Sequence, residues 1–405
     1  MPLTLPDRLP AIDLLKKENI FVMDTTRATT QDIRPLKIVI LNLMPIKITT
    51  ETDLVRLLSN SPLQLEISFM KIKSHTSKNT PVEHMRAFYK DFEVLRQHKF
   101  DGMIITGAPV EHLAFEEVTY WDEMVDIFAW ARTHVTSTLY ICWAAQAGLY
   151  YHYGVPKYPL PEKMFGIFPQ RPLIPQLPIF RGFDDVFYMP HSRHTEIRRA
   201  DIEAVNQHLS APASPAPGAS STSTVPGISP SSPAPSGSPS STVPGASPTS
   251  PAPDASSTSP APSASPASTV PGASSASTVP GASPASTVPG ASSASTVPGG
   301  FAAGIPPLTI IAESEESGVS IVMAREGREF FITGHAEYSP LTLDSEYRRD
   351  LGKGLPIQKP RHYYKADDPN QGPLVTWRAH ANLLFTNWLN YYVYQETPYD
   401  IEQIH

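Results

Sequence analysis

Several residue types and patterns are scarce in this chain of 405 residues, and each scarcity excludes a class of protein. With one cysteine, no disulfide can form within the chain, which is compatible with a reducing compartment. No apolar run approaches the ~18 residues that a membrane-spanning helix needs. The first residues also lack the charged start and apolar core of a signal peptide. We therefore expect a soluble, cytoplasmic protein with no membrane partner.

Charge and histidine patterns point away from nucleic acids and metals. The formal net charge is -7, and no run of basic residues predicts binding to DNA or RNA. The 13 histidines are spread along the chain and do not have the spacing of metal ligands. We expect no metal site and no nucleic-acid partner.

One long segment, 209–300, differs in composition from the rest. It holds 20 of the 44 prolines and one charged residue, Asp254. A nonapeptide, STVPGASSA at 268–276, recurs with one change at 277–285 and unchanged at 286–294. The repeat has no apolar face that could stack and no glycine at every third position, so neither a β-helix nor a collagen helix is predicted. Such a segment buries too little apolar surface to offset its ordering entropy. We predict a disordered insert at 209–300 within a single domain formed by 1–208 and 301–405.

The remaining sequence alternates between strand-like apolar runs and amphipathic helical stretches. Residues 36–45, LKIVILNLMP, and 133–142, THVTSTLYIC, are typical of strands that are buried on both faces. This alternation predicts an α/β fold with a doubly wound, mostly parallel sheet and right-handed crossovers. Further strands are predicted at 63–72, 100–107, 319–324 and 328–333, and helices at 81–97, 121–133, 375–395 and after a capping box at 50–53.

Cys142 lies where an apolar strand ends and a helix of small residues begins. In a nucleophile elbow, the reactive side chain is held on such a turn at the carboxyl end of the sheet. The N-terminus of the helix can stabilise a thiolate and offers free N–H groups to an oxyanion. On position alone, however, a lone cysteine in an apolar stretch is equally well a buried core residue.

A thiol nucleophile needs a base and a group that orients it, and the segment GHAE at 334–337 offers both. On an extended segment, residues two apart point to the same side, so Glu337 could hold His335 in the required tautomer. A His-x-Glu pair by itself is more often a solvated surface pair. Together with Cys142 at a strand end, the pattern favours a catalytic triad.

Four segments resemble the homoserine O-acyltransferase family of methionine biosynthesis. They are ICWAAQAGLYY at 141–151, MPHSRHTE at 189–196, GAPVEHL at 107–113 and ITGHAEYSPLTLDSEYRRD at 332–350. The resemblance covers nearly all of 1–205 and 305–405. It implies a fold like that of class I glutamine amidotransferases and a homodimer.

The resemblance implies a role for each residue that matches the motifs of the family. Cys142 would carry the acyl group as a thioester, His335 would accept a proton, and Glu337 would support the histidine. The residues implied to contact the amino-acid substrate are Lys163, Ser192 and Arg349. Arginine can bind a carboxylate through two hydrogen bonds, and serine offers a short hydroxyl.

Position 111 separates acyl donors in this family. The resemblance implies that members with glycine at this position use succinyl-CoA and that members with glutamate use acetyl-CoA. This chain has Glu111. A carboxylate in the acyl pocket would repel the free carboxylate of a succinyl group. We therefore predict acetyl transfer from acetyl-CoA to the hydroxyl of L-homoserine, giving O-acetyl-L-homoserine and CoA without a cofactor. The backbone N–H of Trp143 is the expected oxyanion donor, inferred from the elbow alone.

Three alternatives remain open at this point. The donor could be succinyl-CoA, or the chain could be a cysteine hydrolase like the glutamine amidotransferases, although a domain that uses released ammonia is missing. A non-catalytic interaction protein, in which the repeat is the functional part, would leave Cys142, His335 and Glu337 unexplained.

Overall fold

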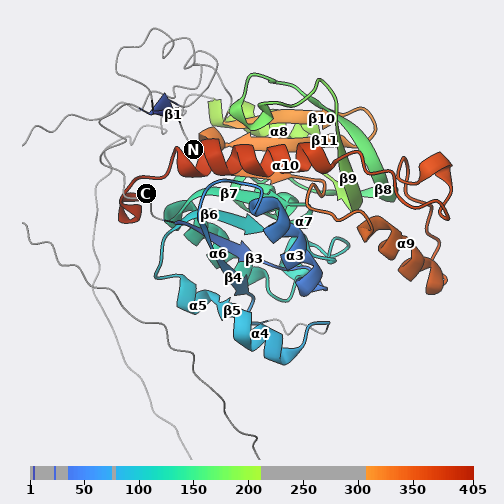
Figure 1. Cartoon of the computed structure of the whole chain (residues 1–405), viewed down its shortest axis with the longest axis horizontal. Coiled ribbons are helices and arrows are strands. Elements are labelled where there is room, and N and C mark those ends of the chain that lie inside the picture. Colours follow the sequence, from blue (N-terminus) through green and yellow to red (C-terminus); the bar gives the residue numbers. More distant parts are fainter. Residues whose placement is uncertain (1–2, 5–21, 24–34, 75–78, 211–306) are drawn as a thin grey trace, which may run out of the picture. The chain divides into compact units, whose positions relative to one another are not determined.

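The computed structural model describes residues 35–74, 79–210 and 307–405, together with two short strands, β1 (Leu3–Thr4) and β2 (Val22–Met23), that pair in parallel. Beyond Ser210, the predicted insert at 209–300 lies outside the described residues. The other strands form one sheet of ten (Figure 1). In chain order they are β3 (Leu36–Leu41), β4 (Leu65–Lys71), β5 (Tyr89–Asp91), β6 (Phe100–Ile105), β7 (Val135–Ile141), β8 (Tyr158–Pro172), β9 (Phe187–Glu196), β10 (Leu308–Ser314), β11 (Gly318–Ala324) and β12 (Glu329–Ile332).

The sheet has a parallel half and an antiparallel half. Its order is β5-β4-β3-β6-β7-β12-β11-β10-β8-β9. All pairings from β5 to β12 are parallel, and all from β12 to β9 are antiparallel. The predicted α/β class with a mostly parallel sheet is confirmed, and the strands predicted at 319–324 and 328–333 form the antiparallel pair of β11 and β12. The strands β8, of 15 residues, and β9 pair with each other and were not predicted from the sequence.

Helices cover both faces of the parallel half, as a doubly wound sheet requires. The α-helices of the described residues are α3 (Lys47–Leu58), α4 (Val82–Phe88), α5 (Phe92–Leu95), α6 (Trp121–His134), α7 (Trp143–Tyr153), α8 (Arg199–Ser210), α9 (Thr342–Gly352) and α10 (Arg378–Asn387), which continues as the π-helix η5 (Trp388–Tyr394). Of these, α8 contacts β10 in the antiparallel half. Within these described ranges, no helix is long and apolar enough to cross a membrane.

The strand β3 shows why both faces are covered. Its side chains point alternately to the two sides of the sheet. Ile38 and Ile40 belong to the core under α3 and α10, which contact each other over one face (Figure 1). Val39 and Leu41 belong to the core under α6 and α7. All four are fully buried, and each such side chain contributes about 1.5–3 kcal/mol to folding.

Two helix predictions are wrong in detail. The helix expected over 81–97 is interrupted by β5, because Tyr89 is buried, donates its hydroxyl to Glu51 at 2.5 Å and pairs at the sheet edge with β4. The helix α3 begins at Lys47, with Ile46 as its N-cap and no side-chain capping bond. The capping box predicted at 50–53 therefore lies inside the helix.

The chain on either side of 211–306 meets in the described structure. The side chain of Asn206 in α8 donates to the carbonyl of Leu308 at 2.6 Å and accepts from its backbone N–H at 3.0 Å. The strand β10, which follows the segment, pairs with β11 and with β8, which precedes it. The two parts of the chain thus share one sheet.

Candidate functional site

Cys142 occupies a strained turn between β7 and α7. It is the N-cap of α7 and has φ 54° and ψ −114°, a conformation that costs a non-glycine residue about 1–3 kcal/mol. Its backbone N–H donates to the carbonyl of Ile332 at 2.7 Å, which ties the turn to the end of β12. The side chain is 3% exposed. This is the geometry of the predicted nucleophile elbow.

His335 reaches Cys142 because their strands are neighbours in register. Ile332 of β12 pairs with Ile141 of β7, so the residues that follow the two strands meet at one edge of the sheet. The backbone N–H of His335 donates to the carbonyl of Pro190 at 2.7 Å. Its Nδ1 lies 2.7 Å from Oε1 of Glu337. The structure thus brings the three residues of the predicted triad together.

The charges around His335 favour its protonated form. Burial alone would lower the pKa of His335, but the negative charges of Cys142 and Glu337, with hydrogen bonds to both, outweigh it and raise the pKa well above its usual value. Since Nδ1 is held by Glu337, the nitrogen left for Cys142 is Nε2. The ring also stacks on Tyr338, with centroids 4.0 Å apart. The arrangement can hold a thiolate beside an imidazolium.

Gly107, after β6, allows the chain to pass close to this pair. A Cβ at this position would lie 3.2 Å from Cβ of Cys142 and 3.4 Å from Cε1 of His335. Trp143 is the first residue of α7, where backbone N–H groups have no partner within the helix. Its indole is fully buried in the core, so only its backbone could serve as the predicted oxyanion donor.

One cavity of about 230 Å³ collects most of the predicted site residues. The predicted residues that line it are Glu111, Cys142, Lys163, Ser192, His335 and Arg349. Glu337 lies behind His335 and does not line the cavity, and Trp143 does not line it either. Among the described residues, no group of three histidine, cysteine or acidic side chains is arranged to hold a metal ion.

Glu346 links two of the residues that are predicted to contact the substrate, Lys163 and Ser192, and it was not itself among the predicted residues. Its Oε2 accepts a hydrogen bond from Ser192 at 2.5 Å and lies 3.2 Å from Nζ of Lys163. Its Oε1 accepts from the hydroxyl of Tyr338 at 3.0 Å. Glu346 lies three residues before Arg349 in α9, and residues with this spacing share a helix face. That spacing was the available signal.

Arg349 lines the same cavity but is already paired. Its Nε and one terminal nitrogen bond the two oxygens of Asp350 at 2.6 and 2.8 Å. The side chain of Arg349 is 48% exposed, whereas that of Asp350 is only 12% exposed. A carboxylate ligand at Arg349 would have to use its remaining N–H groups or displace Asp350.

Glu111 faces the cavity on the loop that follows β6. One oxygen accepts a short hydrogen bond from the backbone N–H of His194, and the carbonyl of Glu111 accepts one from Nζ of Lys157 at 2.7 Å. Burial raises the pKa of this carboxyl, although the His194 N–H and nearby cations act against the rise. Hydrogen bonds therefore hold both the side chain and the backbone carbonyl of Glu111 in place.

The chain matches one family model and several known proteins along most of its length. Residues 2–217 and 299–399 match the family model described as Homoserine O-succinyltransferase. A homoserine O-acetyltransferase of Bacteroides thetaiotaomicron is 57% identical over 404 residues, covering 100% of both chains. One from Brevibacillus brevis is 48% identical, covering 99% of this chain and 98% of that one. A solved glutamine amidotransferase of Thermotoga maritima has a TM-score of 0.43 at 9% identity, covering 89% of this chain and 99% of that one, which is too distant to add to the fold described above.

Proposed function

Because this chain is an acyltransferase that belongs to the homoserine O-succinyltransferase family, we propose that it transfers an acetyl group from acetyl-CoA to the hydroxyl of L-homoserine. The products are O-acetyl-L-homoserine and CoA. The observation that carries the proposal is that Cys142 contacts His335, which in turn contacts Glu337. The same cavity is lined by the predicted substrate contacts Lys163, Ser192 and Arg349.

The first half-reaction forms a thioester on Cys142. The thiolate attacks the carbonyl carbon of acetyl-CoA, and the N-terminus of α7 with the Trp143 N–H stabilises the oxyanion. The bond from that carbon to the CoA sulfur then breaks, and Nε2 of His335 gives its proton to the leaving thiolate. Because the negative charge of Cys142 helps to keep His335 protonated, acylation removes that charge and leaves the imidazole ready to act as a base.

The second half-reaction returns the enzyme to its starting state. The neutral Nε2 of His335 takes the proton of the homoserine hydroxyl, and the oxygen attacks the thioester carbon. The bond from that carbon to the sulfur of Cys142 breaks, so the thiolate and the imidazolium form again. A positioned acid and base of this kind contributes on the order of 10²–10⁴ in rate.

The polar end of the cavity fits a zwitterionic amino acid. Glu346, half-buried and already bonded to Ser192 and Lys163, would accept the α-ammonium group. Lys163 and Arg349 would bind the α-carboxylate, for which Arg349 must share or release Asp350. A substrate that brings both charges can replace these internal pairs, so neither charge is left buried and unpaired.

Two observations support acetyl over succinyl as the transferred group. The relatives of Bacteroides and Brevibacillus named above are homoserine O-acetyltransferases. Glu111 also lines the cavity beside Cys142, where a second carboxylate from a succinyl group would meet it. Like charges at a buried site disfavour binding, which favours the uncharged acetyl group.

The test is to look for the intermediate. After incubation with acetyl-CoA alone, mass spectrometry of the peptides should find an acetyl group on Cys142, and added L-homoserine should remove it as O-acetyl-L-homoserine. The Cys142→Ala variant should keep its fold, carry no acetyl group and form no product. Turnover by this variant would refute the mechanism. Release of ammonia from glutamine, without acyl transfer, would instead favour a hydrolase.

A further inference from the structure

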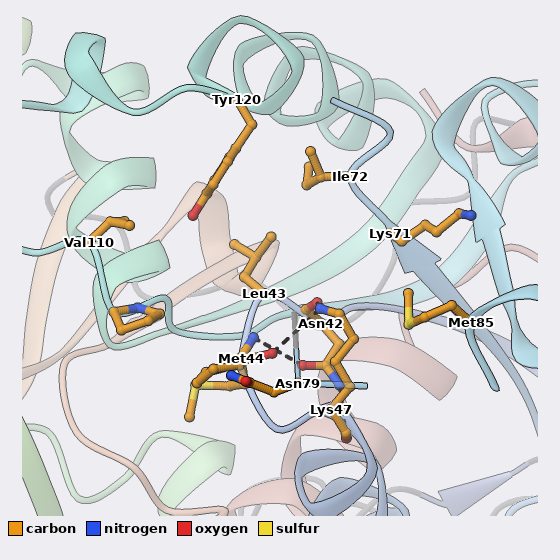
Figure 2. A pocket seen from close by; sticks show the side chains of 12 residues that line it. Asn42, Leu43, Met44, Lys47, Lys71, Ile72, Asn79, Met85, Val110 and Tyr120 are labelled. Carbon is orange, nitrogen blue, oxygen red and sulfur yellow. Dashed lines mark hydrogen bonds between the residues drawn. The ribbon is translucent and has the colours of Figure 1, made fainter. Parts of the chain in front are cut away.

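Figure 2 shows a second cavity, of about 200 Å³. It borders the cavity of Cys142, with which it has lining residues in common. It opens at the carboxyl ends of β3 and β4, and Met85 of α4 forms part of its wall. The side chains of Leu43, Val110 and Tyr120 make much of its lining apolar, while Asn79 and Lys71 add polar groups. None of the predicted site residues lines it.

The two cavities share a wall. Met44 and Pro45, in the turn after β3, and Pro109, in the loop after β6, line both of them. A ligand whose reactive carbon is at Cys142 can therefore extend over these three residues into the second cavity. Ser192 and Glu346, which belong to the proposed amino-acid end, line the cavity of Cys142 but not the second cavity.

Hydrogen bonds hold the shared turn in place, as the dashed lines in Figure 2 show. The side chain of Asn42 donates to the carbonyl of Lys47 at 3.2 Å and accepts from the backbone N–H of Met44 at 3.1 Å. The ammonium of Lys47 donates in turn to the carbonyls of Asn42 and Met44. Lys47 is thus occupied by the turn itself, which leaves Lys71 as the cation at the rim, paired with Asp91 at 3.4 Å.

We propose that this second cavity binds the pantetheine arm of the acyl-CoA donor. The inference rests on the proposed function, because it takes acetyl-CoA as the donor. The arm is a flexible chain of methylene groups, a branched apolar carbon and two amides that ends at a diphosphate. Apolar walls suit the carbon chain, Asn79 can bond an amide, and Lys71 can meet the diphosphate. The amino acid and the CoA arm then approach Cys142 from different sides.

A substitution that fills the second cavity should weaken the binding of acetyl-CoA but not that of a donor without the full pantetheine arm. Met85 is partly buried in α4, and Met85→Trp places a larger ring in the cavity; Val82→Trp, on the 54% exposed Val82 of the same helix, is the matched control. We expect Met85→Trp to raise the KM of acetyl-CoA about tenfold or more, a loss of one decade in affinity. The KM of homoserine and the kcat/KM with S-acetyl-N-acetylcysteamine, a thioester without the rest of the arm, should not change.

A second pair of variants keeps the test decisive if Met85→Trp does not fold. Lys71→Ala removes the cation at the rim and should raise the KM of acetyl-CoA severalfold without affecting the short donor. Asp91→Asn breaks the same ion pair but keeps Lys71, so it should leave the KM of acetyl-CoA unchanged.

The outcomes separate this inference from the proposed function. Equal losses with acetyl-CoA and the short donor, or no loss with either, would overturn the placement of the arm while acetyl transfer by the unmodified enzyme stands. If the unmodified enzyme does not acetylate homoserine with either donor, the proposed function itself fails.

Discussion

Nδ1 of His335 lies 2.7 Å from Oε1 of Glu337, and both side chains are 3% exposed. The extended segment expected at this position is wrong, because the two residues lie in a turn, in which the backbone N–H of Tyr338 donates to the carbonyl of His335 at 3.3 Å. The turn brings the carboxylate to the ring, where it fixes the tautomer. Nε2 is therefore presented to Cys142, which contacts the ring from the end of the neighbouring strand. The pair is buried, so water does not compete for the bond.

Replacing Glu337 by glutamine should slow catalysis without unfolding the protein. Glu337→Gln keeps the shape of the side chain but removes the charge that orients and supports the imidazolium. We expect kcat to fall on the order of 10²–10⁴-fold, as for other orienting groups of a buried histidine. The measurement is steady-state kinetics with a thermal melt. Glu316→Gln, beside the exposed His362 at 3.6 Å, is the control and should change neither.

The ionisation of His335 should depend on Cys142. Burial lowers the pKa of His335, and the charge of Cys142 is the largest contribution that raises it, so Cys142→Ala should shift its loss of a proton to lower pH. A raised pKa in the folded state stabilises the fold below about pH 6.5, and this stability is lost as the pH rises through the folded value. In Cys142→Ala, the stability that protonated His335 contributes should therefore be lost at a lower pH than in the unmodified protein.

Imidazole ¹⁵N NMR across a pH series can follow this ionisation directly. His152 is the internal control, because its titration should not move. Burial lowers the pKa of His152 to about 4, and Glu329 and Arg132 are its charged neighbours. An unchanged midpoint for His335 in Cys142→Ala would show that the thiol carries no negative charge in the resting enzyme.

The meeting of Cys142, His335 and Glu337 could be predicted from the sequence because local patterns determine it. An apolar strand that runs into small helical residues predicts the turn at Cys142, and His335 and Glu337 follow directly after another strand. In a parallel sheet such strand ends lie at one edge, so their meeting does not depend on loop details. The roles of Lys163, Ser192 and Arg349 came from family resemblance, since isolated polar residues carry little signal.

Other features depend on tertiary packing that no short pattern encodes. Glu346 acquires its contacts only because α9 lies beside β8 and β9, where Lys163 and Ser192 are. The interruption at Tyr89 likewise depends on Glu51, 38 residues earlier in the chain. A helical pattern over 81–97 was reasonable locally, and the long-range bond overrode it.

Gly107 should not tolerate a side chain. The added methyl of Gly107→Ala would lie 3.2 Å from Cβ of Cys142, and 3.4 Å from the ring of His335, so one of the two must move. The neighbour must give by a few tenths of an ångström, and the rate should fall by less than the roughly 10²-fold that a displacement of about 1 Å can cost. We expect a loss of kcat with little change in thermal stability. Gly352→Ala, where a Cβ would meet nothing within 4 Å, is the control, and equal activities of the two variants would contradict the prediction.

The segment that the family model leaves unmatched, 218–298, should be dispensable for activity. The ends of the described chain on either side of 211–306 are already joined through Asn206 and Leu308. Replacing 218–298 by a short Gly-Ser linker should leave kcat and the melting temperature close to those of the full chain. Loss of soluble, active protein on deletion would show that the segment contributes to the fold.

Glu111 should decide which acyl group is accepted, and two substitutions can separate charge from size. Glu111→Gly removes both the carboxylate and its bulk, so the ratio of kcat/KM for succinyl-CoA over acetyl-CoA should rise about tenfold or more, equivalent to one decade of discrimination. Glu111→Gln keeps the bulk and removes the charge. If repulsion is the cause, Glu111→Gln should also admit succinyl-CoA, and only Glu111→Gly should do so if size is the cause.

The pH dependence gives an independent check on the charge of Glu111. Burial raises the pKa of this carboxyl, against the hydrogen bond from His194 and the positive charges of His335, Lys163 and Arg193. As the pH falls toward that raised pKa, Glu111 gains a proton and its repulsion of a succinyl carboxylate weakens. The unmodified enzyme should then discriminate less against succinyl-CoA at low pH, whereas Glu111→Gln should show no such trend. An acetyl preference that persists in both variants, at every pH, would rule out Glu111 as the residue that selects the donor.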